Sequence, residues 1–102
     1  MKTELFTKWL NETRNYKKNV VQSRMSNCNT IEQHYLDLDN HYTKDKGQHL
    51  HLLLTYSKND EREDKPTKHG IPINGNLREG SATLKHAAKL YMEFRKQESL
   101  TK

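Results

Sequence analysis

The chain has 102 residues, of which 31% are hydrophobic and 30% charged, and its formal net charge is +5. This length predicts one domain, residues 1–102, with a thin core. The sequence has no apolar run of ~20 residues and no hydrophobic signal segment, which excludes the membrane and secreted classes of protein and favours a cytoplasmic protein. The one cysteine, Cys28, excludes an internal disulfide and is predicted to be a buried, inert thiol in a reducing compartment.

Apolar residues recur with helical spacing through the first third of the chain. A first helix is predicted from Thr3 to Glu12, with Thr3 as its N-cap, and its apolar face comprises Leu5, Phe6, Trp9 and Leu10. A longer helix is predicted over about Tyr16–Tyr35, and its apolar arc comprises Tyr16, Val20, Val21, Met25, Cys28, Ile31 and Tyr35. Arg24 falls inside that arc, so it either extends past the edge of the core or pairs with a carboxylate from a neighbouring segment.

Two short helices are predicted next. Asp37 would cap the first, because its carboxylate can accept bonds from free N–H groups, and Gly47 would end it in the left-handed conformation. The second covers His49–Tyr56, and its inward side chains would be Leu50, Leu53 and Leu54. A turn through Asp60 would follow, capped by Ser57.

Prolines and glycines interrupt the helical pattern from Asp64 to Gly80, which predicts a long loop. Ile71 and Ile73 are expected to anchor this loop, since they point the same way from an extended stretch. The last helix is predicted from Ser81 to about Gln97, and its inner face would comprise Leu84, Ala87, Ala88, Tyr91 and Phe94.

The predicted fold class is therefore all-α, a small single-domain bundle of four or five helices with one long ordered loop before the last helix. The predicted core comprises Trp9, Val20, Met25, Leu53, Leu54, Ala88, Tyr91 and Phe94.

The cations are concentrated in segments that hold no acid. Such segments lie between Glu12 and Glu32, over Lys65–Arg78 and over Gly80–Met92. Concentrated positive charge attracts polyanions, and on the last helix three lysines fall within ~40° of one another on the outer face. These three lysines, Lys85, Lys89 and Lys96, are by themselves typical of a solvated helix surface. Together with the other cations they predict a phosphate-binding set, which comprises Arg14, Lys18, Lys65, Lys68, Arg78, Lys85, Lys89 and Lys96.

No catalytic signature accompanies these cations. The chain has no nucleophile elbow, P-loop, HExxH motif or nuclease carboxylate pair, so no enzyme activity and no cofactor are predicted. The pair His49-x-His51 has no partner at zinc spacing, which argues against a metal site. The acidic stretch Asp60–Asp64 lacks the pattern of a calcium loop and is expected to be solvated or, alternatively, to mimic phosphate toward a basic partner.

Two stretches support a family resemblance. The first is Asp37-Leu38-Asp39-x-x-Tyr42, and the second runs from Ile71-Pro72-Ile73-Asn74-Gly75-Asn76 through Gly80-x-Ala82-Thr83-Leu84 to Ala87-Ala88-x-x-Tyr91 and Phe94. They resemble the small helical module at the N-terminal end of bacterial restriction-type endonucleases and related phage or defence proteins, and more distantly the SAM-like arm domain of tyrosine recombinases. The resemblance covers about Leu5 to Phe94 and implies a DNA-associated accessory domain. We expect no catalytic domain to follow it here.

Two functions therefore remain open. The first is a sequence-tolerant, non-catalytic DNA-binding module of phage or mobile-element origin, which contacts phosphates through the basic loop and the last helix. The alternative is a protein-interaction adaptor, whose thin core is completed by a partner protein or a second copy. No membrane partner is expected.

Overall fold

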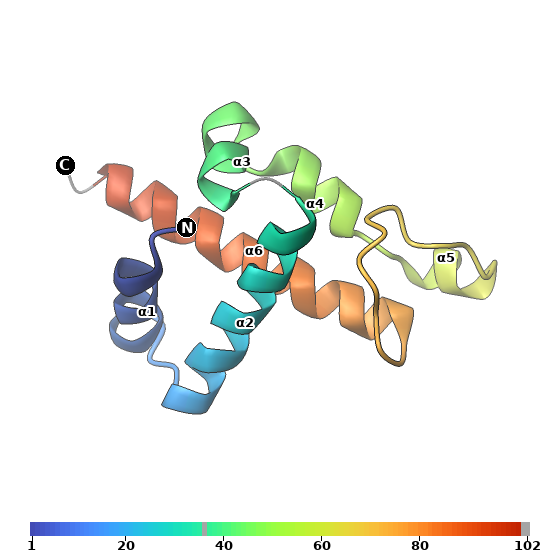
Figure 1. Ribbon diagram of the computed structural model, residues 1–102, viewed down its shortest axis with the longest axis horizontal. Coiled ribbons are helices and arrows are strands. Elements are labelled where there is room, and N and C mark those ends of the chain that lie inside the picture. Colours follow the sequence, from blue (N-terminus) through green and yellow to red (C-terminus); the bar gives the residue numbers. More distant parts are fainter. Residues whose placement is uncertain (36, 101–102) are drawn as a thin grey trace.

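The computed structural model describes residues 1–35 and 37–100, in which six helices are joined by short turns and one longer loop (Figure 1). The helices are α1 (Thr3–Glu12), α2 (Lys18–His34), α3 (Leu38–Asp45), α4 (Gln48–Leu54), α5 (Lys58–Arg62) and α6 (Leu77–Leu100). The predicted all-α class is confirmed, and α5 corresponds to the turn expected after Ser57. None of these six helices combines the length and the apolar character that crossing a membrane requires.

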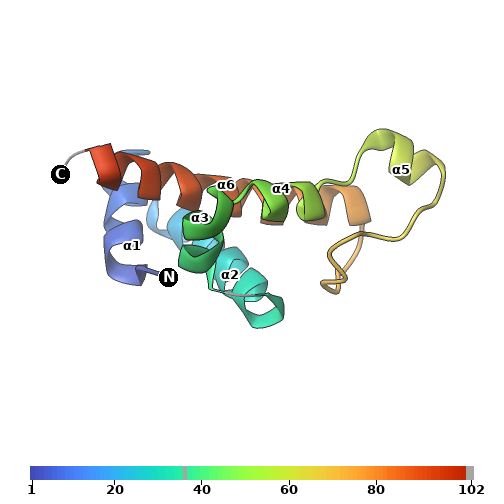
Figure 2. The same cartoon turned by 90° about the horizontal axis from the view of Figure 1, so that it is seen from above.

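Helix α6 is the central element of the fold. It contacts each of the other five helices, and Figure 2 shows it running along the length of the molecule with α1 and α2 on one side. Its predicted inner face is confirmed, since all five of those side chains are buried. Aromatic rings join it to α1: Phe6 lies edge-on to Tyr91 at 4.9 Å between ring centroids, and Phe94 lies 5.5 Å from Phe6.

The core differs from the predicted one along α2 and α4. Val20, Met25 and Leu53 are only half-buried, whereas Val21 is buried. The prediction spread a broad apolar arc over α2, but only one edge of that arc faces α6. This edge comprises Val21, Cys28 and Ile31, which are spaced by seven and then three residues, as expected for one side of a helix.

Two of the predicted caps are confirmed and one is wrong. The Asp37 carboxylate accepts a hydrogen bond from the Asp39 N–H at 2.7 Å, and Ser57 forms a capping box with Asp60. Thr3 does not cap α1: Lys2 occupies that position without a side-chain bond, and its N–H donates to the Tyr91 hydroxyl at 2.8 Å. The free N–H is therefore satisfied by tertiary packing and not by a local cap.

The turn between α3 and α4 is tighter than predicted. Lys46, with φ of 58°, already ends α3 in the left-handed conformation, and Gly47, with φ of 80°, then begins α4. Gly47 is thus left-handed as expected, but it serves the start of the next helix.

The long loop covers residues 63–76, and α6 begins at Leu77, four residues earlier than predicted. The Asn76 side chain accepts from the Glu79 N–H at 2.9 Å, which starts the helix before Gly80. Ile71 is 2% exposed and Ile73 is half-buried against the core, so both isoleucines anchor the loop as predicted.

Acidic side chains are collected at the N-terminal end of the fold. The Met1 ammonium group lies 2.8 Å from Asp37 and 3.3 Å from Asp39. Asp39 also accepts from the Tyr91 hydroxyl at 2.5 Å and pairs with Arg95. Burial acts to raise the pKa of Asp39, but these donors outweigh it and hold that pKa below its ordinary value.

Candidate functional site

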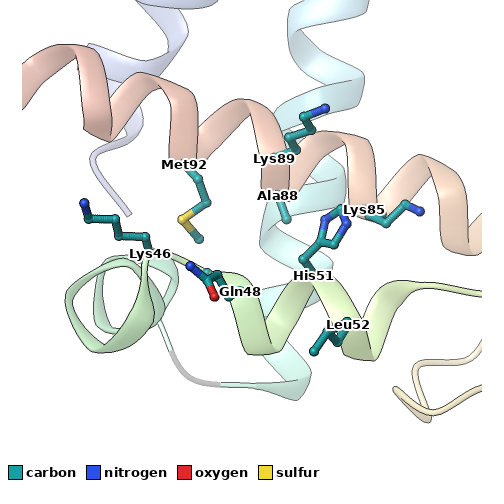
Figure 3. Close-up of a pocket in the computed structure, with 9 residues that line it drawn as sticks. Lys46, Gln48, His51, Leu52, Lys85, Ala88, Lys89 and Met92 are labelled. Carbon is teal, nitrogen blue, oxygen red and sulfur yellow. The ribbon is translucent and has the colours of Figure 1, made fainter.

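A groove of about 370 Å³ opens between α4 and α6, beside the α3–α4 turn (Figure 3). We call it the lysine groove, and its lining comprises Lys46, Gly47, Gln48, His51, Leu52, Lys85, Ala88, Lys89 and Met92. Figure 3 shows the His51 side chain pointing from α4 toward α6 beside Lys85. The lining thus holds three lysines and one histidine, and no carboxylate.

The local sequence explains why the groove forms here. Lys85 and Lys89 lie one turn apart on α6, as do Ala88 and Met92, so the helix offers the groove a cationic edge and an apolar edge. Gly47 lets the α3–α4 turn approach this helix closely, because a Cβ at that position would lie 2.8 Å from the Met92 Cγ.

The lysine groove is electrostatically positive. Lys46, Lys85 and Lys89 have no ion-pair partner within residues 1–35 and 37–100. Burial lowers the pKa of His51, and the charges of Lys85 and Lys89 lower it further, so this imidazole holds a proton less readily than an ordinary histidine. The positive charge that the groove presents to a ligand is therefore carried mainly by the three lysines.

Cations of α2 and of the α1–α2 turn also lie near α6. Burial lowers the pKa of His86, and the charges of Arg24 and Arg14 lower it further; Glu93 opposes this shift, and Lys89 adds a smaller lowering effect. The charges of two arginines, one lysine and one carboxylate therefore act on His86.

The residues predicted to contact phosphates divide into two groups, one on α6, α2 and the α1–α2 turn and the other near the long loop. Lys85 and Lys89 line the lysine groove, and Lys96 is exposed farther along the outer face of α6. Lys18 is exposed at the start of α2, and Arg14 lies over the Tyr16 ring and 3.7 Å from Glu93.

The cations near the loop lie beside the acids of α5, at the end of the molecule where α6 begins (Figure 1). Lys65 pairs with Glu63 at 2.9 Å, and Arg78 pairs with Glu61 at 3.3 Å. Lys68 is exposed, and its charge helps to hold the pKa of Asp60 down, after the hydrogen bonds of Ser57. The fold therefore does not bring the loop cations together with the lysine groove.

Sequence reasoning missed Lys46 and His51 as members of this site. Lys46 begins an acid-free run, residues 46–59, but Lys58 is the only other lysine or arginine in that run, so the cations are not concentrated there; His51 belongs to a His-x-His pair, a pattern that points first to metal binding. The signal that could have found Lys46 is its position beside Gly47 at a predicted helix end, where the chain reverses toward the last helix.

Arg24 takes the first of the two predicted alternatives. In the part of the chain that the structure describes it forms no ion pair, and it lies half-buried at the edge of the core. Its Nε is buried without a hydrogen-bond partner. Arg24 is therefore a cation whose hydrogen-bonding capacity is not used internally.

Cys28 is buried as predicted, with its Sγ 3.6 Å from the Ala87 carbonyl oxygen. Burial raises the pKa of this thiol to about 12, so it is not a nucleophile at neutral pH. Within the described residues, no group of three or more His, Cys, Asp or Glu side chains is placed to hold a metal ion.

Comparison with protein-family models, curated proteins and solved structures gave no match to this chain. The resemblance to the endonuclease-associated helical module is therefore still a hypothesis based on the short motifs alone.

Proposed function

We propose that this protein is a non-catalytic DNA-binding module that holds the phosphate backbone in the lysine groove. The observation that carries the proposal is a groove lined by three lysines that form no ion pair, and by no carboxylate, in the part of the chain that the structure describes. A lysine ammonium is a compact, strongly hydrated charge, which suits contact with phosphate oxygens.

The spacing of the lysines supports contact with successive phosphates. Lys85 and Lys89 are separated by about 6 Å along α6, from the rise of ~1.5 Å per residue. Lys46 comes from the α3–α4 turn across the groove, so the charges flank a ligand from two sides. Such contacts fix the position of a duplex but carry no sequence information themselves.

The loop cations have a smaller part in this proposal than the sequence suggested. Lys65 and Arg78 already neutralise Glu63 and Glu61, and these acids would repel phosphates that approached the same region. We therefore place the main contact on α6 and the α3–α4 turn.

The first test is charge reversal in the groove. Lys85→Glu with Lys89→Glu should weaken binding to a random-sequence duplex by more than tenfold at ~50 mM salt, since two phosphate contacts become repulsions. Fluorescence anisotropy measures the affinity, and circular dichroism should show unchanged helicity because neither side chain is part of the core.

The matched control is Lys8→Glu with Lys58→Glu, which changes the net charge equally at exposed positions outside the groove. It should weaken binding far less. Equal losses in the two double variants would show that only net charge matters and would remove the lysine groove from the interface.

A second candidate, a protein-interaction adaptor or homodimer, is favoured by one observation. Leu52 is 63% exposed at the edge of the lysine groove, where a partner could bury it. Sedimentation equilibrium tests the homodimer: the adaptor function predicts a dimer that Leu52→Ser converts to a monomer of 12.1 kDa. A wild type that is already a monomer would contradict the homodimer. The DNA-binding proposal predicts that Leu52→Ser weakens duplex binding far less than the double lysine variant, because it removes no charge from the groove.

A further inference from the structure

The exposed surface of α2 consists largely of uncharged hydrogen-bonding side chains. Its exposed amide and hydroxyl residues are Asn19, Gln22, Ser23, Ser26, Asn29 and Gln33. On the side toward α6 this surface is hollowed into a second groove of about 800 Å³, which we call the amide groove. Its lining includes Asn19, Gln22, Ser23, Arg24, Asn27 and Thr83.

The amide groove offers hydrogen-bonding groups that the protein itself leaves unused. The side-chain amides of Asn19, Gln22 and Asn27 make no hydrogen bond within residues 1–35 and 37–100. The Ser23 hydroxyl donates to the Asn19 carbonyl at 3.1 Å, so its oxygen can still accept. Among the described residues, the Nε of Arg24 is buried without a hydrogen-bond partner, and no carboxylate lines the groove.

Helix stability does not explain this composition. Asn and Ser are poorer helix formers than Lys, Glu or Ala, which would serve equally well on a solvated face. Soluble surfaces ordinarily carry interspersed charges, yet along α2 the charged residues are Lys18 at its start, Arg24 at the edge of the core and Glu32, which lies 3.4 Å from the Met1 ammonium group. The exposed amides are therefore better explained by a ligand.

Helix α6 separates the amide groove from the lysine groove. Thr83 lines the amide groove, whereas Lys85, about 200° around the same helix from Thr83, lines the lysine groove. A duplex that spans the exposed face of α6 would contact both grooves.

We propose that the amide groove reads base edges of this duplex, so that binding prefers particular sequences. This inference rests on the proposed DNA-binding function. Asn and Gln side chains pair with the N6 and N7 of adenine and an arginine with the O6 and N7 of guanine, and the major groove admits an α-helix. Phosphate contact alone would favour lysines, and the amide groove has none in its lining.

The experiment is selection from a pool of duplexes with a randomised central segment, sequenced before and after capture on the protein. The variant is Asn19→Ala with Gln22→Ala, which keeps α2 intact because both residues are exposed and Ala favours helix. The control is Asn40→Ala with Asn59→Ala, which removes two exposed amides from α3 and α5.

The wild type and the control should enrich the same base pairs. The α2 variant should lose about tenfold in preference for the enriched sequence while its affinity for the unselected pool stays within about twofold.

Three results would overturn the inference. If the wild type captures the pool with the expected salt dependence but enriches no sequence, the amide groove does not read bases and the proposed function stands. If the α2 variant loses affinity for the pool and for the enriched sequence alike, the groove contacts phosphates. If the wild type captures no duplex at ~50 mM salt, the proposed function fails as well.

Discussion

Gly47 positions the lysine groove through two separate constraints. Its φ of 80° is unfavourable for any residue with a side chain, and a Cβ there would collide with Met92. Gly70 has a similar φ of 66°, but nothing lies within 4 Å of the place its Cβ would occupy. Comparing substitutions at the two glycines therefore separates the free-energy cost of backbone strain from the cost of the steric contact with Met92.

Gly47→Ala should destabilise the fold by about 2–3 kcal/mol, whereas Gly70→Ala should cost about 1 kcal/mol, the strain of a left-handed backbone alone. Urea unfolding at pH 7.5 measures both free energies. Equal costs at the two positions would mean that Met92 moves aside freely and that the turn does not depend on a close approach to α6.

His69 holds the loop to α6 at the residue scale. His69 is 5% exposed, and its Nδ1 accepts a hydrogen bond from the Ile71 N–H at 2.9 Å. Because Nδ1 is an acceptor, Nε2 carries the proton and donates to the Ser81 hydroxyl oxygen at 2.8 Å. Burial lowers the pKa of His69, and the charge of His34 lowers it further. Protonation of Nδ1 would remove the acceptor for Ile71.

This arrangement predicts the direction of a pH effect. A histidine whose folded pKa lies below the unfolded value of about 6.5 contributes stability above that pH, and the contribution is lost as the pH falls toward the folded pKa. The free energy of unfolding should therefore fall between pH 7.5 and 5.0, and His69→Gln should make that fall shallower. His49→Gln is the control, because His49 is exposed and its side chain makes no hydrogen bond to any described residue. An unchanged pH dependence in His69→Gln would contradict the proposed role.

At the scale of elements, the contact between the loop and α6 depends on a glycine within a helix. Gly80 lies in the first turn of α6, and a Cβ there would collide with the Cγ2 of Ile73. Ile73 is half-buried, and its branched carbon cannot swing away as a long flexible side chain could.

Gly80→Ala should consequently have opposite effects in two backgrounds. In the wild type it should destabilise by about 1 kcal/mol, because losing the packing of Ile73 outweighs the gain of up to ~1 kcal/mol in helix propensity. In an Ile73→Ala background the same change should stabilise by about that gain. Thermal unfolding of the four proteins measures the cycle, and the same sign in both backgrounds would refute the contact.

The helices themselves could be predicted from apolar periodicity, and α1 has its predicted bounds because its apolar face is unambiguous. The start of α6 could not, because Gly80 is typical of a loop and only the Asn76 cap and the Ile73 contact show that it lies in a helix. Similarly, Val20 and Val21 are equivalent by composition, and only packing on α6 decides which is buried.

At the scale of the whole molecule, acids and cations are segregated. Glu32, Asp37 and Asp39 surround the Met1 ammonium group at one end. The acids of α5 lie near the opposite end of α6, where Glu61 and Glu63 pair with cations of their own region. The lysine groove lies between these two acidic regions, and its lysines form no ion pair within residues 1–35 and 37–100.

This segregation explains how far the site could be predicted. Lys85 and Lys89 were found because both lie on one helix face, a property of local sequence. The cations that are neutralised are set by ion pairs between distant segments, such as that of Arg14 with Glu93. No pattern in a single sequence specifies such ion pairs.

The salt dependence of duplex binding tests the central claim most directly. Binding of a random 20-base-pair duplex is measured by fluorescence anisotropy between 50 and 200 mM salt at pH 7.5, above the ordinary pKa of histidine. Three lysine–phosphate contacts predict a slope of log K against log salt of about −2.7, a loss of about 40-fold over this range. Lys85→Ala with Lys89→Ala should reduce the slope to about −1. A wild-type affinity that does not change with salt, or no binding at 50 mM, would contradict the account.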